Sequence, residues 1–272
     1  MVAPSDRPRL LLVGCGNMGR AILSGWLGSG RMAPEQVLVL DPAAPPLPDG
    51  VRGFAGLGEM PACDIAAAVL AIKPQLVGQL AADFAGERRL APLLLSVLAG
   101  VPLARLATLF PQALPVRFMG NLAAAFGRSP VAVCAGQTLD PAAAALVDDV
   151  LAPLGPVEWL NDEDQLHAVT ALAGSGPGFV YRFLDALAQG SAALGLPPAA
   201  GARMALATVA GAAELAARSG EDFAALAARV ASKGGTTEAG LSVLDRDGGL
   251  QQLVGATLEA ARTRSRQLAG DG

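Results

Sequence analysis

The chain contains 272 residues, of which 52% are hydrophobic and 16% are charged, and this balance excludes an intrinsically disordered protein. Its formal net charge of −4 provides no general attraction to phosphate backbones, so we expect no nucleic-acid partner. One histidine and three cysteines are too few for a metal site built mainly from these residues, and we expect no metal. The length suffices for one large domain or two modest ones.

The first 160 residues alternate between short apolar runs and longer segments that suit helices. The apolar runs lack polar alternation, as strands covered on both faces do, and they span residues 10–13, 37–40, 65–72, 93–97, 116–119, 131–134 and 157–160. Segments 17–30, 74–86 and 140–154 are long enough for crossover helices, and Asp140 before Pro141 favours a helix start. This alternation predicts an α/β fold with a Rossmann-like, doubly wound parallel sheet.

The remaining residues contain no convincing strand pattern. Breaks that contain Gly, Pro or Ser divide them into about five helices and lie at residues 174–178, 195–198, 219–220, 232–235 and 247–249. We therefore predict a dinucleotide-binding domain over residues 1–160 and an all-helical domain over residues 161–272. Because the helical half is rich in small residues, we expect it to complete its core against a second chain.

A glycine-rich turn follows the first predicted strand and opens a helical segment with the sequence Gly14-Cys15-Gly16-Asn17-Met18-Gly19. Gly14 would form the tight turn, Gly16 would leave room for a pyrophosphate at the helix start, and Gly19 would let helix and strand pack. The next predicted strand ends at Asp41, 22 positions after Gly19, close to the spacing of an acidic ribose ligand. These features predict a dinucleotide site; a generic glycine-rich turn is the alternative reading.

Two residues at strand ends are candidates for cofactor contacts. Asp41 would repel a 2′-phosphate, and the Pro-Ala-Ala-Pro-Pro segment after it has no Arg, Ser or Thr to bind one, which favours NAD over NADP. The alternative is that Asp41 only caps its own loop. Lys73 follows the third predicted strand, at the edge where such sheets bind ligands, and it either contacts the cofactor or begins a solvated helix.

A second candidate site lies between two predicted helices, in the segment Ser232-Lys233-Gly234-Gly235-Thr236-Thr237. Two glycines followed by hydroxyl residues at a helix start direct several backbone N–H groups toward one point, which suits a substrate carboxylate. The hydroxyl groups could add hydrogen bonds to the same ligand. Taken alone, these residues favour the simpler reading of one helix ending at glycine and the next being capped.

Two further features have no assigned role. The glycine-rich residues 174–178 allow either a close approach of another group or a helix kink. His167 is the only histidine, and a lone histidine on a helix is more typical of a surface or packed side chain than of a catalyst.

Four segments in this order resemble the pyrroline-5-carboxylate reductase family. They are residues 14–19, residues 71–75 (Ala-Ile-Lys-Pro-Gln), residues 169–177 (Val-Thr-Ala-Leu-Ala-Gly-Ser-Gly-Pro) and residues 232–241 (Ser-Lys-Gly-Gly-Thr-Thr-Glu-Ala-Gly-Leu). The similarity extends from about residue 9 to about residue 265, and the last two segments are the more specific. The resemblance implies a Rossmann domain, a helical dimerisation domain that interlocks with a partner subunit, and the final step of proline synthesis.

The resemblance also implies roles for individual residues. The cofactor would be held by Gly14, Gly16, Asn17, Met18 and Gly19, and its nicotinamide side would be lined by Lys73, Pro74 and Gln75. The substrate carboxylate would be bound by Ser232, Gly234, Gly235, Thr236 and Thr237, with the Thr237 hydroxyl reaching the ring nitrogen as the catalytic candidate.

The chain departs from the family pattern in several loops. The family usually has Met-Pro-Asn-Thr-Pro after the sixth strand, whereas residues 119–123 are Met-Gly-Asn-Leu-Ala; Asn121 is retained as a candidate cofactor contact. Residues 54–57 lack an asparagine that is common near the adenosine ribose, and Lys233 replaces a usual proline. The substrate loop is therefore closer to the family pattern than the loops on the cofactor side.

We therefore expect an NAD(P)H-dependent reductase that converts 1-pyrroline-5-carboxylate to L-proline and forms a homodimer or larger homo-oligomer. The family resemblance implies that NADPH is usable, whereas Asp41 favours NADH. A reductase of another cyclic imine or imino acid, and a dinucleotide-binding sensor without catalysis, are the alternatives. Three isolated cysteines suit the cytoplasm, and Arg203 and Glu214 interrupt the most apolar long stretch, so we expect no membrane span.

Overall fold

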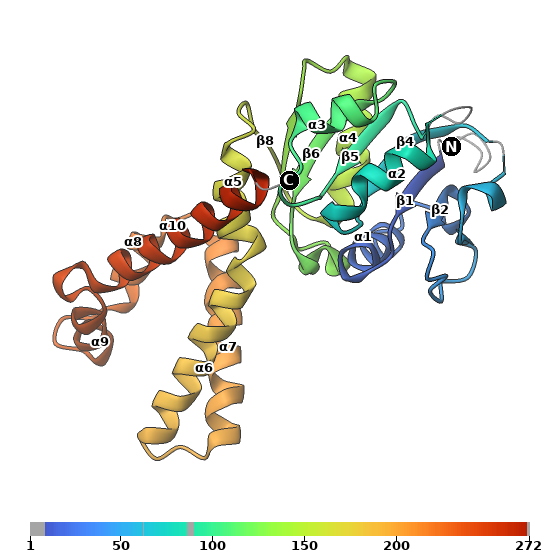
Figure 1. Ribbon diagram of the computed structural model, residues 1–272. Helices are drawn as coiled ribbons and strands as arrows, with labels where there is room; N and C mark the ends of the chain where they lie inside the picture. Colours follow the sequence, from blue (N-terminus) through green and yellow to red (C-terminus); the bar gives the residue numbers. More distant parts are fainter. Residues whose placement is uncertain (1–8, 62, 86–89, 271–272) are drawn as a thin grey trace. The chain divides into compact units, whose positions relative to one another are not determined.

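The computed structural model describes residues 9–61, 63–85 and 90–270 (Figure 1). The chain divides into two compact units, one formed by Met1–Gly174 together with Ala261–Gly272 and the other by Ser175–Ala260. Among the described residues, no helix combines the length and apolar character needed to cross a membrane.

The first unit is built on one eight-stranded sheet with the strand order β3-β2-β1-β4-β5-β6-β7-β8. The strands are β1 (Arg9–Val13), β2 (Val37–Leu40), β3 (Arg52–Phe54), β4 (Ile65–Leu70), β5 (Leu93–Ser96), β6 (Leu114–Met119), β7 (Val131–Ala135) and β8 (Val157–Trp159). All neighbours are parallel except β6 and β7. Val13 pairs with Leu40 on one side and with Leu70 on the other, so β1, β2 and β4 end at the same edge.

Helices cover both faces of this sheet. The α-helices before residue 170 are α1 (Asn17–Gly28), α2 (Val77–Asp83), α3 (Leu103–Leu109), α4 (Pro141–Leu151) and α5 (Gln165–Val169). Short 3-10 turns are η2 (Pro34–Gln36), η3 (Leu57–Glu59), η4 (Pro74–Leu76), η5 (Leu122–Phe126) and η6 (Ala152–Leu154), and η7 (Thr170–Gly174) is a π-helical turn.

Alternate residues of β1 enter two separate cores because successive strand side chains point to opposite faces. Leu10 and Leu12 pack with residues of α1 and α4, whereas Leu11 and Val13 pack with residues of α2 and α3. The indole N–H of Trp26, on α1, donates to the Val150 carbonyl on α4 at 2.8 Å. The predicted doubly wound α/β fold is confirmed, with strands at all seven predicted runs.

Two features of the sheet were not predicted. β3 has only three residues, and with glycine at its centre it shows neither an apolar run nor an alternation of apolar and polar residues. β7 runs antiparallel to β6 because only residues 120–130 connect them, which is too short for the crossover that a parallel neighbour needs. The predicted start of α4 is confirmed: the Asp140 carboxylate accepts from the Ala143 N–H at 2.8 Å, and Pro141 is the first helical residue.

The division into compact units places residues 161–174 and 261–272 with the sheet. A boundary after residue 160 remains our proposal for where the dinucleotide-binding domain ends. The predicted helical segment 74–86 corresponds to η4 and α2, and its last residue lies outside the described residues.

Polar contacts connect residues 163–167 to β6 and to Ser265 near the end of the chain. Arg117, 4% exposed on β6, forms a 2.6 Å ion pair with Glu163, whose Oε1 also accepts from the Leu103 N–H. His167 Nδ1 lies 2.9 Å from the Ser265 hydroxyl, and burial lowers the pKa of His167 below its ordinary value. His167 therefore has a packing role.

The second unit is helical. It contains α6 (Gly176–Ala193), α7 (Pro198–Ser219), α8 (Phe223–Val230), α9 (Thr236–Leu244), the 3-10 turn η8 (Arg246–Gly248) and the first half of α10 (Gly249–Gly270). α6 and α7 lie side by side (Figure 1), and a Cβ at Gly201 on α7 would overlap the Ser191 hydroxyl on α6. The fully described helices α6, α8 and α9 contain no buried residue.

Candidate functional site

The glycine-rich turn connects β1 to α1 at the carboxyl edge of the sheet. Gly14 has a φ of +91°, and a Cβ there would lie 2.7 Å from the Ala71 carbonyl oxygen, just after β4. Gly19 is buried, and a Cβ there would overlap the Gly14 carbonyl oxygen. A Cβ at Gly16 would meet no atom within 4 Å. The turn therefore needs glycine at positions 14 and 19 for packing, whereas position 16 leaves the start of α1 uncovered.

The start of α1 offers backbone N–H groups to a ligand. The helix has no side-chain cap, and its first intrahelical hydrogen bond runs from the Arg20 N–H to the Gly16 carbonyl at 2.9 Å. The N–H groups of the preceding residues, Asn17 to Gly19, point along the axis at the positive end of the helix dipole. Asn17 is exposed and Met18 is half-buried against the core. This arrangement suits a phosphate group.

Asp41 follows β2 and holds the turn through two backbone hydrogen bonds. One carboxylate oxygen accepts from the Cys15 N–H at 2.6 Å and the other accepts from the Ala43 N–H at 2.8 Å. The residue thus caps its own loop and also fixes the glycine turn. Each carboxylate oxygen has a second lone pair, so a ribose hydroxyl could still donate to it. Burial raises the pKa of the neighbouring Cys15 thiol, which keeps that thiol protonated at neutral pH.

The loop after β4 lies at the same edge. Lys73 precedes η4 and Pro74 is its first residue, and both Lys73 and Gln75 are exposed. The Lys73 side chain forms no hydrogen bond or ion pair with the described part of the chain. β1 and β4 are neighbours in the sheet. After β1 the chain adds β2 on one side of this pair, and after β4 it adds β5 on the opposite side. Gly14 and Lys73 therefore flank the topological switch point, where open α/β sheets bind ligands.

Two cavities adjoin this edge and were not found from the sequence. The first, of about 220 Å³, is mainly apolar, with Val13, Leu40, Ile72, Leu76 and Leu80 among its lining residues. A flat apolar group such as an adenine ring suits such a lining. The only sequence signal was Ile72, the last residue of the predicted apolar run 65–72, which lies two residues beyond the end of β4.

The second cavity, of about 230 Å³, contains two carboxylates, Asp41 and Glu59. Glu59 is held in place because its Oε2 accepts from the Ala55 N–H at 3.0 Å. Glu59 was not identified from the sequence, because nothing in its local pattern distinguishes it from an ordinary exposed glutamate. The pair gives this side of the switch point a negative charge, which opposes a phosphate.

Asn121 is occupied by structural hydrogen bonds. Its side-chain oxygen accepts from the Ala123 N–H at 2.9 Å, and its side-chain amide donates to the Ala173 carbonyl in the π-helical turn η7 at 2.9 Å. Asn121 thus ties the loop after β6 to η7. π-Helical turns frequently mark functional sites, and this one coincides with the third resemblance segment.

The candidate substrate loop belongs to the second unit and is described on its own. Gly234 has a φ of +72°, and the Gly235 N–H donates to the Ser232 carbonyl at 2.8 Å, which closes a tight turn before α9. A Cβ at Gly235 would lie 2.5 Å from the Ser232 hydroxyl oxygen. Thr236 and Thr237 are the first residues of α9, and the Thr237 side chain is half-buried.

The start of α9 also has free donor capacity. Its first intrahelical hydrogen bond runs from the Ala239 N–H to the Gly235 carbonyl, so the amides of residues 236–238 precede the helical ladder. The Glu238 carboxylate reaches back and accepts from the Gly234 N–H at 2.6 Å. A carboxylate already bound at this turn shows that the backbone there can bind one.

The structure thus brings Gly14 to Gly19, Asp41 and Lys73 to Gln75 to one edge of the sheet, and it presents residues 232–237 as a separate turn in the second unit. Within the described ranges, no cluster of three or more His, Cys, Asp or Glu side chains is arranged to hold a metal ion.

Residues 163–268 match the family model described as pyrroline-5-carboxylate reductase dimerisation. Over 265 residues the chain is 34% identical to a pyrroline-5-carboxylate reductase of Synechocystis sp., covering 96% of this chain and 98% of that protein. A pyrroline-5-carboxylate reductase of Pseudomonas aeruginosa is 33% identical over 267 residues, covering 96% of this chain and 97% of that protein.

Solved structures show the same fold. A pyrroline-5-carboxylate reductase structure from Coxiella burnetii has a TM-score of 0.85 at 26% identity, covering 96% of this chain and 98% of that one. A Plasmodium falciparum pyrroline carboxylate reductase, solved with NADP bound, has a TM-score of 0.82 at 22% identity, covering 97% and 99%. Both the sequence relatives and the fold extend over nearly the whole chain. The chain therefore belongs to the pyrroline-5-carboxylate reductase family.

Proposed function

We propose that this chain reduces 1-pyrroline-5-carboxylate to L-proline with a reduced nicotinamide dinucleotide. The observation that carries the proposal is family membership over 96% of the chain, with the substrate loop of the family retained. When bound, the reduced nicotinamide supplies a hydride to the imine carbon, the ring nitrogen gains a proton, and the cofactor leaves in its oxidised form. The residues of this chain bind and orient the two reactants.

The carboxyl edge of the sheet fits a dinucleotide. The uncovered position at Gly16 gives a pyrophosphate access to the N–H groups at the start of α1, and the apolar cavity beside β1 suits the adenine ring. Lys73, Pro74 and Gln75 follow β4 and would line the nicotinamide side. Asn121 supports this side indirectly by fixing the loop after β6 to η7.

Within this proposal, the cofactor preference is for NADH. Asp41 and Glu59 line the same cavity at the end of β2, where a 2′-phosphate would place further negative charge. We expect Asp41→Asn and Glu59→Gln each to raise the ratio of kcat/KM for NADPH to kcat/KM for NADH by about tenfold. Glu59→Gln keeps an amide oxygen for the Ala55 N–H, whereas Asp41→Asn keeps an acceptor for only one of the two N–H groups, those of Cys15 and Ala43, that the carboxylate now binds. A wild-type enzyme that favours NADPH by a wide margin would contradict this assignment.

The substrate carboxylate would bind the amides at the start of α9 together with the Ser232 hydroxyl, and the Thr237 hydroxyl would face the ring nitrogen. A protonated imine is already electrophilic, so Thr237 need only orient or stabilise that nitrogen. We expect Thr237→Val to lower kcat while leaving the cofactor dissociation constant unchanged, and Thr237→Ser to restore most of the rate. Wild-type turnover in Thr237→Val would remove this role from the residue.

The decisive experiment is an initial-rate assay of the purified chain with 1-pyrroline-5-carboxylate, followed by the loss of reduced nicotinamide absorbance. A six-membered cyclic imino acid, assayed in parallel with both cofactors, tests ring size. Equal or faster turnover of the larger ring would instead favour a different imine reductase. Cofactor binding without any turnover would favour a sensor.

The helical unit supports a further proposal, that the chain forms a homodimer or larger homo-oligomer. α6, α8 and α9 bury no residue, and large apolar side chains such as Tyr181, Leu194 and Phe223 are 68%, 90% and 80% exposed. Such exposure is unusual for a chain that functions alone. We also propose a cytoplasmic location, because the three cysteines are free thiols and Cys15 and Cys134 are buried.

A further inference from the structure

Arg20 places a positive charge at the amino end of α1. It lies in the first turn of the helix, its side chain is exposed, and its Nε donates to the Cys15 carbonyl at 3.1 Å. Because helical side chains lean toward the amino terminus, this hydrogen bond holds the guanidinium beside the glycine turn. Burial raises the pKa of the Cys15 thiol and the Arg20 guanidinium partly offsets that rise, which agrees with this placement.

This end of the helix is electrostatically unfavourable for a cation. The amino end of a helix has a partial positive charge, so anions are favoured there and cations at the carboxyl end. No carboxylate in the described part of the chain forms an ion pair with Arg20, and the Asp41 carboxylate binds the Cys15 and Ala43 N–H groups instead. The guanidinium therefore adds to the positive field around the uncovered Gly16. An arginine held there without a counter-charge calls for an anion from outside the chain.

We propose that Arg20 is a ligand of the dinucleotide pyrophosphate. Its Nε stays on the Cys15 carbonyl, and its Nη groups donate to the phosphate oxygens that the amides at the start of α1 also bind. The inference rests on the proposed function for the identity of the ligand, a nicotinamide dinucleotide. It explains how this edge binds phosphates beside Asp41 and Glu59. Because NADH and NADPH share the pyrophosphate, Arg20 supports both, and the preference between them is left to the two carboxylates.

The test is isothermal titration calorimetry of the full chain with NADH, NADPH and ADP-ribose, without imine. All three ligands contain the pyrophosphate, and ADP-ribose lacks the nicotinamide ring. We expect Arg20→Gln to raise the three dissociation constants by about tenfold and by similar factors, since a hydrogen bond to a charged group is lost. Arg20→Lys keeps the charge and should lose less affinity than Arg20→Gln. Because Arg20 is exposed, both variants should keep the wild-type thermal midpoint.

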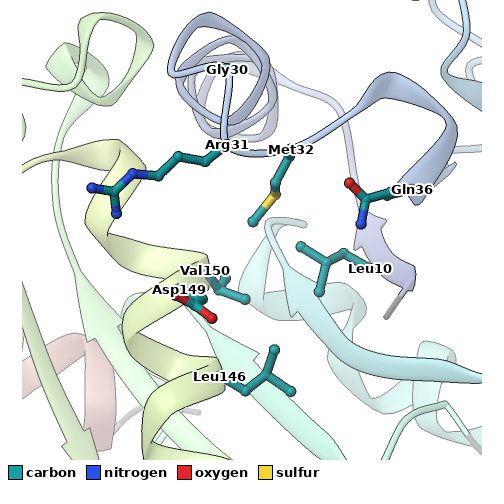
Figure 2. Close-up of a pocket in the computed structure, with 8 residues that line it drawn as sticks. All are labelled: Leu10, Gly30, Arg31, Met32, Gln36, Leu146, Asp149 and Val150. Atoms are coloured by element: carbon teal, nitrogen blue, oxygen red, sulfur yellow. The ribbon is translucent and has the colours of Figure 1, made fainter. Parts of the chain in front are cut away.

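Arg31→Gln is the matched control, because it removes the same charge beyond the opposite end of α1. Arg31 is exposed in the connection after the helix, beside a cavity of about 530 Å³ near the start of β1 (Figure 2). The 12 residues of α1 span about 18 Å, roughly twice the Debye length of about 8 Å at physiological ionic strength. The charge of Arg31 is therefore screened from the glycine turn, and its removal should change the dissociation constants by less than about twofold.

The salt dependence of binding separates an ionic contact from a change in the shape of the turn. The dissociation constant of ADP-ribose should rise with KCl concentration in the wild type, because salt screens the attraction between Arg20 and the pyrophosphate, and it should rise less in Arg20→Gln.

Four results would overturn the proposal. They are wild-type affinity in Arg20→Gln, equal losses in Arg20→Gln and Arg31→Gln, a loss in Arg20→Lys as large as that in Arg20→Gln, and an unchanged salt dependence in Arg20→Gln. The reductase function is measured separately by turnover. A chain that binds dinucleotides through Arg20 without reducing the imine would refute that function alone, whereas a wild type that binds none of the three ligands would refute both.

Discussion

Gly14→Ala should destabilise the sheet unit through two separable effects. At a φ of +91° an L-residue is strained, and the added Cβ would lie 2.7 Å from the Ala71 carbonyl oxygen and 2.8 Å from the Ile72 Cγ2. Left-handed backbone costs an L-residue about 1–2 kcal/mol, and overpacking costs about 1–3 kcal/mol. The free energy of unfolding should therefore fall by about 2–5 kcal/mol, a large share of typical domain stability.

Gly30→Ala is the matched control because Gly30 also has a positive φ, +67°, but a Cβ there would meet no atom within 4 Å. It should cost only the backbone strain, about 1–2 kcal/mol. Urea unfolding followed by tryptophan fluorescence measures both, since Trp26 is fully buried in the sheet unit. If Gly14→Ala is no more destabilising than Gly30→Ala, the close approach between the ends of β1 and β4 is wrong.

Three further predictions follow from packing and charge. Burial lowers the pKa of His167 below its ordinary 6.5, so the unfolded chain binds a proton more readily and the free energy of unfolding should fall as the pH drops below about 6.5. Urea unfolding at pH 7.5 and 5.5 measures this fall in the wild type, and the fall should be smaller in His167→Gln. An equal fall in both proteins would contradict the prediction. Glu163→Gln should lower the free energy of unfolding by about 3 kcal/mol, because it leaves Arg117 buried without its counter-charge. Urea unfolding at neutral pH measures this change, and wild-type stability in the variant would contradict the prediction. Phe223→Asp should weaken self-association, measured by analytical ultracentrifugation. Phe126→Asp is the control, because Phe126 is equally exposed but lies outside the matched dimerisation region, and it should leave self-association unchanged. Equal effects of the two substitutions would argue against an interface through α8.

Much of the fold could be predicted from the sequence because its signals are local. Buried parallel strands leave unbroken apolar runs, and glycines mark turns such as the one at Gly14. The short strand β3 was not predicted, because three residues with glycine in the middle are too few to show an alternation of apolar and polar side chains. The reversal of β7 follows from the short connection, residues 120–130, between two of the predicted runs; the prediction of a parallel sheet did not take that length into account.

The candidate site was predictable in its positions but not in its contacts. Spacing placed Asp41 at a strand end, yet only the structure shows that its carboxylate also holds the Cys15 N–H across the turn. Asn121 was chosen for its resemblance to a family loop. Its hydrogen bond with the Ala123 N–H is a local cap of η5, whereas its hydrogen bond to the Ala173 carbonyl depends on the loop after β6 lying close to η7. The Glu238 contact with Gly234 likewise depends on the backbone of the turn. Contacts between residues far apart in the sequence, such as Asp41 with Cys15 and Asn121 with Ala173, are not visible in the local pattern of a single sequence.

The two hydrogen bonds of Asp41 constrain how such an enzyme could exchange one cofactor for another during evolution. A small residue at this position would admit a phosphate, but it would release the Cys15 and Ala43 N–H groups and loosen the turn that begins α1. The first mutational step would therefore weaken binding of both dinucleotides before it improved either. A small residue at position 41 is therefore expected only together with a second substitution that caps the turn, whereas an amide that keeps an acceptor for the turn can change the preference singly.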